Sequence, residues 1–380
     1  MMALVDCLSS VSGGAVSYLR NVIPRLYGLF KASGESHKLR LLVHESQKVL
    51  FPGIPASEFI VLAGPRMSGY RRVWWEFFNI PNVVAETKAD VLFYPYQIGL
   101  RVNGVKKVHM LCNMDPFHFH RYEYDFKLRI RNHLLKFESR RSLSTADRVI
   151  AISRYVEYYL VQFLGIHPSK VRLIYNGSDK SFGPRGQVSR DAALIAELNI
   201  FGDFILTVGS LFPYRRCEDV IAAFGRIEPT IRRDLTLVIA GSGTDWHYSR
   251  VLDRAIAASG VADRVRLVGH VSPEAMQALY RCCRLCVIAS EVEACPNIAI
   301  EAMEAGCVTV ASDSPPLPEI FDGGATHFPS RDIPTLAETM QRCLSDEKLR
   351  QELSERSRTR AQDFSWDRCA CETYSALVDW

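Results

Sequence analysis

Short apolar segments of strand length alternate along this chain with longer segments whose apolar residues recur every three or four positions. The short segments predict buried strands, and the longer ones predict amphipathic helices. The predicted strands are Ala3–Val5, Leu39–Val43, Phe59–Leu62, Val91–Tyr94, Lys107–Leu111, Arg148–Ile152, Val171–Ile174, Phe204–Val208, Leu235–Ala240, Val265–Val268, Leu285–Ile288 and Val308–Ala311. Their regular alternation with helices predicts an α/β fold with two doubly wound, Rossmann-like domains that face each other across a cleft.

A Gly- and Pro-containing segment near the middle of the chain, residues 183–187, predicts the linker between these domains. We therefore expect a first domain over residues 1–181 and a second over residues 182–365. A last amphipathic helix is expected over residues 366–380. Each domain has an ordinary size for a single hydrophobic core.

Composition narrows the class of protein. Of the 380 residues 48% are hydrophobic, but no apolar run approaches the roughly 18 residues that would span a membrane. The first residues lack the basic and apolar segments of a signal peptide. The eleven cysteines are an odd number that mostly stand singly in apolar runs, and their spacing does not complete a zinc site. We expect a cytoplasmic protein without disulfides or a bound metal.

The net charge of +4 is unevenly distributed along the chain. Residues 1–180 hold 25 Lys and Arg against 14 Asp and Glu, whereas residues 181–380 hold 21 against 28. The basic first half indicates an anionic acceptor or peripheral contact with an anionic membrane on the inner face of the plasma membrane, and solvated helix faces are the alternative. The Arg-rich helix predicted over Phe126–Ser144 is the candidate surface. The aromatic segment Arg71–Phe78 allows a lipid-contacting helix, but its helical spacing favours the core.

The most informative motif is the segment Ser290–Gly306. It reads as a loop after a strand, followed by a helix that begins near Pro296 and ends at a glycine. The N–H groups at a helix start suit a phosphate or diphosphate. Glu293 lies before that start and Glu301 one turn inside it, so both carboxylates could accept hydrogen bonds from sugar hydroxyls. A nucleotide sugar carries this combination of groups.

Two further turns suit the approach of an anion. Gly13 and Gly14 follow the first strand and open a helix, where glycine lets a ligand come close to the backbone. Arg215 and Arg216 form a basic pair after the strand Phe204–Val208 and before a helix. An arginine can hold phosphate oxygens bidentately. A tight strand-to-helix turn and an exposed basic pair are the alternatives without a ligand.

The segment from Glu293 to Ser312, together with the basic pair and the Gly-Gly turn, resembles the retaining glycosyltransferases of family 4, which have the two-domain GT-B fold. The resemblance covers nearly the whole chain. It implies that the first domain binds the acceptor, that the second binds the donor nucleotide, and that the last helix crosses back to the first domain. It also implies that Glu293 faces the transferred sugar and that Glu301 holds the ribose.

Other donor contacts are implied by matching positions. Arg215 stands where the family has a lysine, with Arg216 beside it, and Ser210 stands where many members have arginine. The remaining donor-binding candidates are Gly13 and Gly14 over the diphosphate, His270 near the base, and Pro296, Asn297 and Ile298 at the helix start.

On the acceptor side, a loop follows the strand Lys107–Leu111. Many relatives have a histidine there, and this chain has Cys112 in one such position, so no catalytic histidine is assigned. The candidates for acceptor contact are Asn113, Asp115, His118 and His120, for which loop capping is the alternative.

These observations predict transfer of a sugar from a UDP- or GDP-sugar to a hydroxyl of a saccharide or lipid-linked saccharide, with retention implied by the family. Arg215, with Arg216, and the helix start would stabilise the leaving diphosphate. The Asp-x-Asp metal motif of the other glycosyltransferase class is not apparent in the sequence, so neither an essential metal nor another cofactor is expected. No nucleic-acid partner is expected, and cell-envelope polysaccharide or lipopolysaccharide synthesis is the setting by analogy. The alternatives are a nucleotide-sugar epimerase or a phosphorylase of the same fold, a catalytically silent nucleotide-sugar-binding protein, and a dehydrogenase, which the incomplete glycine pattern at Gly241 and Gly243 disfavours.

Overall fold

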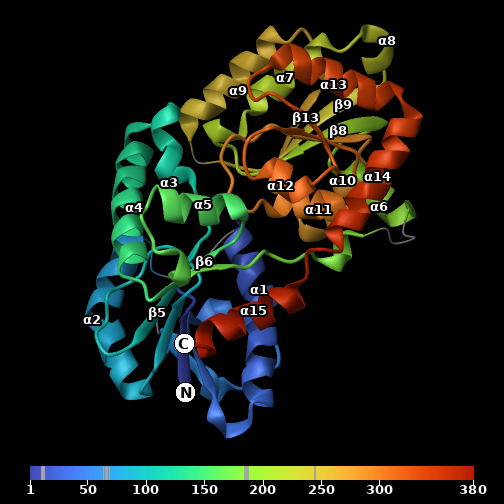
Figure 1. The fold of residues 1–380 in the computed structure, drawn as a ribbon. Helices are drawn as coiled ribbons and strands as arrows, with labels where there is room; N and C mark the ends of the chain where they lie inside the picture. Colours follow the sequence, from blue (N-terminus) through green and yellow to red (C-terminus); the bar gives the residue numbers. More distant parts are fainter. Residues whose placement is uncertain (10–12, 63, 65–66, 68, 184–187, 244) are drawn as a thin grey trace. The chain divides into compact units, whose positions relative to one another are not determined.

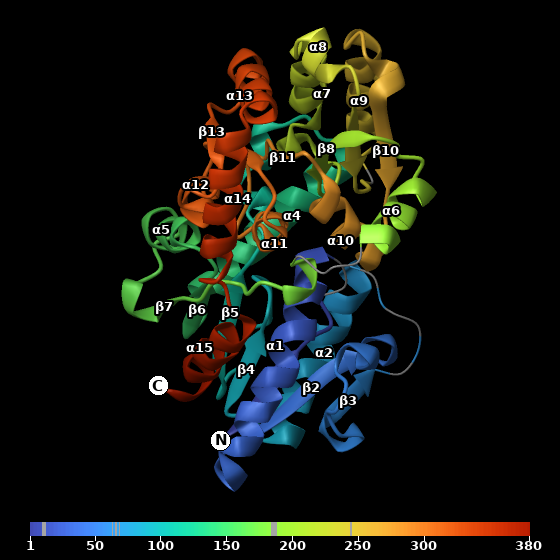
Figure 2. The same ribbon diagram turned by 90° about the vertical axis from the view of Figure 1, so that its right-hand side faces the viewer.

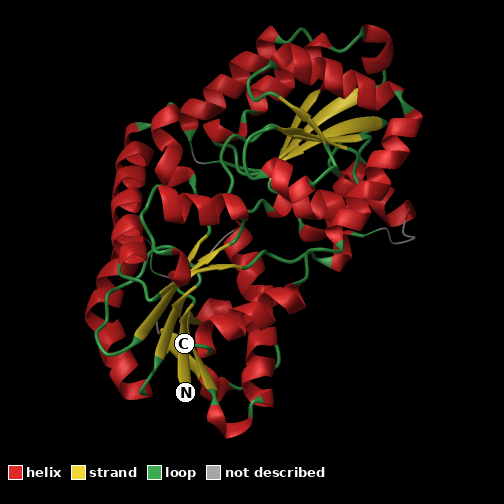
Figure 3. Ribbon diagram, viewed as in Figure 1, coloured by secondary structure: helices red, strands yellow, loops and turns green. Residues whose placement is uncertain are grey.

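The structure, a computed structural model, describes residues 1–9, 13–62, 64, 67, 69–183, 188–243 and 245–380. These residues form thirteen strands in two separate sheets, and every strand pair is parallel (Figures 1 and 3). The chain divides into two compact units. Unit 1 comprises residues 1–113, 133–177 and 365–380, and unit 2 comprises residues 114–132 and 178–364. The predicted α/β class with two Rossmann-like sheets is confirmed.

The sheet of unit 1 has seven strands in the order β3-β2-β1-β4-β5-β6-β7. Its strands are β1 (Met2–Asp6), β2 (Lys38–His44), β3 (Phe59–Leu62), β4 (Val91–Tyr94), β5 (Lys106–Leu111), β6 (Arg148–Ala151) and β7 (Val171–Leu173). The order reverses beside β1, whose Ala3 pairs with Leu39 on one side and with Val91 on the other. Because helices cover both faces, the central strands are apolar throughout instead of alternating.

The helices of unit 1 include an unusually distant pair. The last helix, α15 (Trp366–Val378), packs beside α1 (Gly13–Ala32), as Figures 1 and 2 show. The hydroxyl of Tyr18 lies 3.2 Å from that of Thr373, and Arg148 donates to the backbone carbonyl of Ala376 at 2.6 Å. The other helices are α2 (Gly69–Thr87), α5 (Arg154–Gln162) and the second half of α4 (Phe126–Ser144).

The sheet of unit 2 has six strands in the order β10-β9-β8-β11-β12-β13. They are β8 (Asp203–Val208), β9 (Leu235–Ala240), β10 (Val265–Gly269), β11 (Leu285–Ile288), β12 (Thr309–Ser312) and β13 (Thr326–Phe328). The helices are α3 (Asp115–His118), α6 (Val188–Glu197), α7 (Cys217–Arg226), α8 (Pro229–Arg232), α9 (Trp246–Ala258), α10 (Pro273–Cys282), α11 (Asn297–Ala305), α12 (Leu317–Phe321), α13 (Ile333–Ser345) and α14 (Glu347–Ala361). Asp245, Ser272 and Asp332 each cap a helix by accepting a hydrogen bond from a backbone N–H of its first turn.

Residues 114–132 belong to unit 2, although we expected them in a first domain that ran to residue 181. The reason is an aromatic cluster. Phe119, Tyr124 and Leu128 are buried, and Phe212 and Tyr214 from the loop after β8 pack against them. The rings of Phe212 and Tyr214 stack at 6.0 Å. Such long-range packing has no signature in the local sequence.

All twelve predicted strands are present, each end within one residue of its expected position. The strand β13 was not predicted, because three residues are too few for a recognisable pattern. The helix over Phe126–Ser144 is confirmed with the expected bounds. The linker predicted at residues 183–187 lies, after Gly183, outside the described residues.

The aromatic segment of α2 contradicts our preference for the core. Trp74, Phe77 and Phe78 are 66%, 58% and 57% exposed, whereas Trp75 packs against the buried cluster of unit 1, together with Ile80, Val83 and Val84 of the same helix. A helix that packs on a sheet buries only one of its sides, so aromatic residues that lie off that side stay exposed. Among the described residues, no helix combines the length and the apolar character needed to cross a membrane.

Candidate functional site

The candidate site lies in unit 2, at the carboxyl edge of its sheet. The strand order reverses between β8 and β11, whose connections leave in opposite directions. In doubly wound sheets such a reversal opens a crevice that binds ligands. The loop after β8 carries Arg215, and the loop after β11 carries Ser290 and Glu293. The topology therefore brings together charged residues that are 78 positions apart in the chain.

Arg215 is held across this reversal point by three contacts. Its Nη1 donates to the hydroxyl of Ser290 at 3.1 Å and forms an ion pair with Oε1 of Glu293. Its guanidinium lies against Gly209, where an added Cβ would come within 3.1 Å of Arg215 Cζ. Gly209 also has a φ of +136°, a conformation that favours glycine, and a side chain there would press against the guanidinium. The short loop thus orients the guanidinium toward the carboxyl edge.

The ion pair is mostly buried, with side-chain exposures of 14% for Arg215 and 9% for Glu293. Burial raises the pKa of Glu293, but the charge of Arg215 and the hydrogen bond with Ser290 act in the opposite direction. Burial alone would lower the pKa of Arg215, and the neighbouring Glu293 carboxylate raises it instead. Each charge therefore stabilises the other in a place where water is largely excluded.

The backbone beside Arg215 is packed so closely that it requires two more glycines. A Cβ on Gly241 would lie 1.8 Å from the carbonyl oxygen of Gly209, and one on Gly243 would lie 2.2 Å from that of Leu211. The loops after β8 and β9 are also joined by the hydrogen bond from Leu211 N to Ser242 O, at 3.1 Å. The Gly-x-Gly sequence after β9 thus has a packing role.

Glu301 lies one turn inside α11, which begins after Pro296 without a side-chain cap. Burial raises the pKa of Glu301 to about 7, while a hydrogen bond with Tyr280 lowers it and the charge of Asp179 raises it further. Both glutamates of the predicted pair therefore belong to unit 2, one before the helix and one within it. Asn297 and Ile298 occupy the first two helical positions, as predicted.

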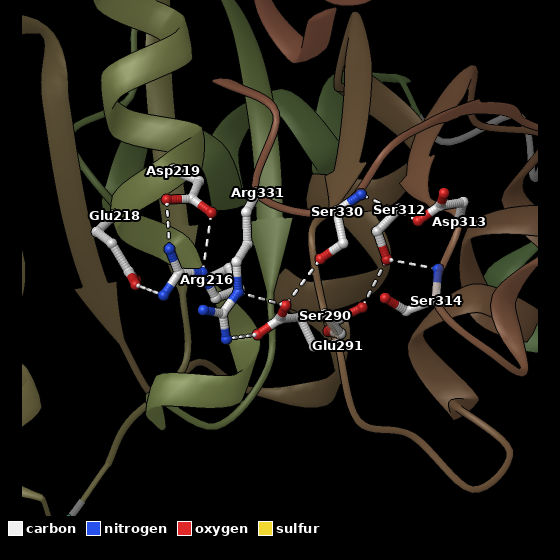
Figure 4. Close-up of polar contacts among 10 residues, drawn as sticks. All are labelled: Arg216, Glu218, Asp219, Ser290, Glu291, Ser312, Asp313, Ser314, Ser330 and Arg331. Carbon is white, nitrogen blue, oxygen red and sulfur yellow. Dashed lines mark hydrogen bonds and ion pairs between the residues drawn. The ribbon is translucent and has the colours of Figure 1, made fainter. Parts of the chain in front are cut away.

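Arg216 has a different environment from Arg215. It adopts a left-handed conformation with a φ of +52°, and its side chain turns to the start of α7. Its Nε and Nη2 donate to Asp219 at 2.9 and 2.8 Å, and its Nη1 lies 2.7 Å from Oε1 of Glu218. Figure 4 shows this arrangement. Two carboxylates already neutralise Arg216, so its contacts favour a role in positioning the loop over direct contact with a donor.

A second polar cluster was missed by the sequence reasoning (Figure 4). Glu291 accepts two hydrogen bonds from Arg331, at 2.7 and 2.9 Å, and one from the hydroxyl of Ser330 at 2.9 Å. Burial alone would raise the pKa of Glu291, but these hydrogen bonds hold it below its usual value. The hydroxyl of Ser312 donates to the carbonyl oxygen of Ser290 at 2.6 Å. Loops after β11, β12 and β13 are thereby tied together beside Arg215.

The sequence contained only a weak signal for this cluster. Glu291 lies in the segment that we singled out, but Arg331 follows the strand that we did not predict. Arg331 also has a φ of +67°, a conformation that nothing in its local sequence indicates.

The other predicted donor residues are placed as follows. Ser210 and His270 are exposed, at the ends of β8 and β10. Gly13 and Gly14 belong to unit 1 and are exposed at the start of α1, where Gly13 has a φ of +56°. The structure therefore gathers Arg215, Glu293, Glu301 and the start of α11 in unit 2. The donor roles of all these residues, including Arg215, Glu293 and Glu301, stay predictions.

The acceptor candidates are divided between the units. Asn113 belongs to unit 1, whereas Asp115 and His118 belong to unit 2 and are buried. The carboxylate of Asp115 accepts hydrogen bonds from the hydroxyl of Tyr124 at 2.5 Å and from the amide of Asn132 at 3.2 Å. These contacts hold residues 114–132 together, so they favour a structural role for Asp115. His120 is exposed.

The described residues were also searched for a metal site. Within them, no group of three or more His, Cys, Asp or Glu side chains is arranged to hold a metal ion. The positive charge at the carboxyl edge of the sheet comes instead from arginine side chains and from the start of α11.

Two family models together match most of this chain. The model described as Glycosyltransferase Family 4 matches residues 12–182, and the model described as Glycosyl transferases group 1 matches residues 197–360. The serotype-specific mannosyltransferase WbdA of Escherichia coli is 24% identical over 236 residues, which cover 62% of this chain but 28% of that protein. The D-inositol 3-phosphate glycosyltransferase of Salinispora arenicola is 29% identical over 257 residues, which cover 62% of this chain and 55% of that protein.

The chain therefore spans well under two thirds of the length of these relatives. Solved structures match it from end to end. Anabaena Alr3699/HepE in complex with UDP and glucose has a TM-score of 0.76 at 18% identity, with 100% of both chains covered. Sucrose-phosphate synthase from Thermosynechococcus elongatus has a TM-score of 0.72 at 19% identity, covering 98% of this chain and 96% of that one. The fold is that of the GT-B glycosyltransferases, and the chain belongs to glycosyltransferase family 4.

Proposed function

We propose that this protein transfers a hexosyl group from a nucleoside-diphosphate sugar to a hydroxyl of a saccharide or lipid-linked saccharide, with retention of anomeric configuration. The observation that carries the proposal is the buried pair of Arg215 and Glu293 across the strand reversal of unit 2. Family membership supports glycosyl transfer, and Alr3699/HepE, which shares the fold, binds UDP and glucose. Cell-envelope polysaccharide synthesis on the cytoplasmic side is the setting that we propose.

In this proposal Arg215 stabilises the negative charge that develops on the leaving diphosphate. A guanidinium has five N–H donors, and the contacts to Ser290 and Glu293 both use Nη1. The remaining donors can contact phosphate oxygens while the ion pair keeps the group oriented. Such preorganisation matters because charges fixed in a place poor in water need no rearrangement when the glycosidic bond breaks.

Glu293 and Glu301 have distinct roles in the proposal. Glu293, fixed by Arg215, would accept hydrogen bonds from hydroxyls of the transferred sugar. Glu301, inside α11, would accept them from the ribose, and the N–H groups at the start of α11 would face the diphosphate. Because arginine and the helix supply the positive charge, we propose that the reaction needs neither a metal nor an organic cofactor.

Donor binding can be tested by thermal unfolding in the presence of UDP, GDP, ADP and their sugar conjugates. A ligand at about 100 times its Kd stabilises the folded state by about 2.7 kcal/mol, so the panel identifies both base and sugar. Turnover is then measured as release of the nucleoside diphosphate, with and without EDTA, using the conjugate that binds. Stabilisation by none of the nucleotides contradicts the proposal, and binding without turnover in the presence of saccharide acceptors supports a silent binding protein instead.

A further inference from the structure

The exposed apolar residues of α4 form one continuous stripe. Phe126, Ile130, Leu134 and Phe137 are 77%, 45%, 62% and 63% exposed. At about 100° per residue, these four positions fall within roughly 80° of each other around the helix. The buried residues Leu128, Asn132 and Ser139 lie on the opposite side. The helix therefore turns a mixture of polar and apolar residues to the protein, and four large apolar side chains to the solvent, where a surface helix usually carries polar residues.

The same helix is strongly basic. Between Phe126 and Ser144 it carries six Lys and Arg residues and a single acid, Glu138. The same helical geometry places Lys127 on one side of the stripe and Arg129, Lys136 and Arg140 on the other side. Arg141 lies within the stripe. Of these, Arg141 pairs with Glu138 at 3.1 Å. The apolar stripe is thus bordered by positive charge along its length.

Helix α2 adds a second exposed apolar group. Phe78 packs against both Trp74 and Phe77, with ring centroids 5.2 Å apart for Trp74 and Phe78 and 5.1 Å for Phe77 and Phe78. α2 connects β3 to β4 and α4 connects β5 to β6, in the same direction along the sheet. Right-handed crossovers place such helices on one face of the sheet, and α1, which runs the other way, on the opposite face. Within unit 1, Figure 1 shows α2 and the second half of α4 along the side opposite α1 and α15.

We propose that the face formed by the exposed residues of α2 and of the second half of α4, which both belong to unit 1, binds the surface of an anionic phospholipid bilayer. The apolar stripe would enter the boundary between headgroups and acyl chains, and the basic residues would contact the phosphates. Aromatic side chains such as those of α2 favour this interfacial depth. The proposal goes beyond the glycosyl transfer proposed above, because it concerns a partner surface that needs no donor.

Charge decides between this occupant and a second copy of the chain. A symmetric dimer through this face would bring two copies of α4 together, each with an excess of five positive charges. Like charges at such an interface repel, whereas a negatively charged bilayer attracts every one of them. A membrane surface also accepts a convex apolar stripe, which a protein partner would have to match with a groove.

The test is co-sedimentation of the whole protein with vesicles, in the absence of donor. Vesicles of phosphatidylcholine alone are compared with vesicles in which about one third is phosphatidylglycerol, at low and high salt. We expect binding to the anionic vesicles that weakens as salt is added. The triple variant Arg129→Gln, Lys136→Gln, Arg140→Gln should bind about 100-fold more weakly, from about fivefold per charge. The variant Leu134→Ser, Phe137→Ser should lose at least about tenfold.

The matched control is Phe201→Ser, which removes a phenylalanine that is 71% exposed in unit 2. It should bind vesicles like the wild type, and all variants should keep the wild-type unfolding temperature because the changed side chains are exposed or, for Lys136, half-buried at the helix surface. Absence of binding to anionic vesicles, or equal loss in Phe201→Ser, would overturn the proposal. Self-association of the wild type that Leu134→Ser, Phe137→Ser abolishes, without vesicle binding, would assign the face to a protein interface instead.

Discussion

The two sheets carry charged residues at the same topological place but with opposite balance. In unit 2, beside the reversal between β8 and β11, one arginine faces one buried glutamate, Arg215 and Glu293. In unit 1, beside the reversal between β1 and β4, two acids share one arginine. Asp6 ends β1, and Glu76 and Arg72 of α2 form an ion pair at 3.0 Å. Asp6 and Glu76 are both buried, at 2% and 5% exposure.

The difference in balance changes which neighbouring charges act on the pKa of each acid. Burial raises the pKa of Glu76, the charge of Asp6 raises it further, and Arg72 only partly opposes them. Burial also raises the pKa of Asp6, against its hydrogen bond with the backbone of Leu8 and the charge of Arg72. Burial raises the pKa of the acids in both units, but in unit 2 one arginine is matched to one acid, whereas in unit 1 the second acid has no cation of its own and the charge of one acid raises the pKa of the other further. A balanced pair suits charge stabilisation during a reaction, and an unbalanced cluster makes folding depend on pH.

The largest effect is expected from removing the cation of the Arg215–Glu293 pair in unit 2. Arg215→Ala removes the proposed stabiliser of the diphosphate and leaves Glu293 buried without its cation, so turnover should fall about 10²- to 10³-fold. The measurement is turnover at saturating donor, together with thermal unfolding to confirm that the protein is folded. Arg226→Ala, an exposed arginine of the same unit, is the control and should behave like the wild type. Wild-type turnover in Arg215→Ala would remove the arginine from the mechanism.

A second pair of variants separates the two glutamates of unit 2. Glu293→Gln should lower turnover about 10- to 100-fold with donor binding largely kept, because it faces the transferred sugar in our proposal. Glu301→Gln should mainly weaken binding of the nucleotide, since it lies beside the proposed ribose position. Donor titrations and initial rates distinguish the two, with the exposed Glu274→Gln as control. The same kinetic defect in both variants would contradict the assignment of separate roles.

The next variant removes one acid from the cluster of unit 1, so that one acid and one arginine remain, as in unit 2. Glu76→Gln leaves one acid, Asp6, beside Arg72. An acid with a raised pKa binds its proton more tightly in the folded state, so wild-type stability falls as the pH rises above about 4.3. The variant should flatten this fall between pH 5 and pH 8 by about 1 to 2 kcal/mol.

This effect is read from unfolding free energies across that pH range. Glu86→Gln, which removes an exposed acid from the same helix, is the control and should keep the wild-type slope. Parallel curves for Glu76→Gln and the wild type would show that the cluster does not retain a proton.

The smallest effect concerns Glu301, whose pKa is about 7. Its carboxylate is the better hydrogen-bond acceptor, so affinity for the nucleotide sugar should rise two- to threefold, at order of magnitude, as the pH passes from 6 to 8. A nucleotide sugar has no titration of its own in this range, so binding curves report on the protein. Glu301→Gln should show a flat profile. A wild-type profile in that variant would assign the pH dependence to another group.

The sequence by itself determined the fold class, the positions of twelve strands and the family. Strand-length apolar runs separated by helical patterns specify parallel sheets, because both faces of such strands are buried. The sequence also placed Glu293, Arg215 and Glu301 on loops and helices at the carboxyl ends of strands, where parallel sheets gather their ligands. These are consequences of local pattern and topology, so they can be read without coordinates.

Only the tertiary structure decided which charged residues form pairs and which surfaces stay exposed to solvent. The pairing of Arg215 with Glu293, the cluster of Glu291 with Arg331 and the assignment of residues 114–132 to unit 2 all join segments distant in the chain. The aromatic residues of α2 have core-like spacing, yet Trp74, Phe77 and Phe78 are exposed. Helical periodicity shows that residues share a face, but whether another element covers that face depends on long-range packing that no local pattern records.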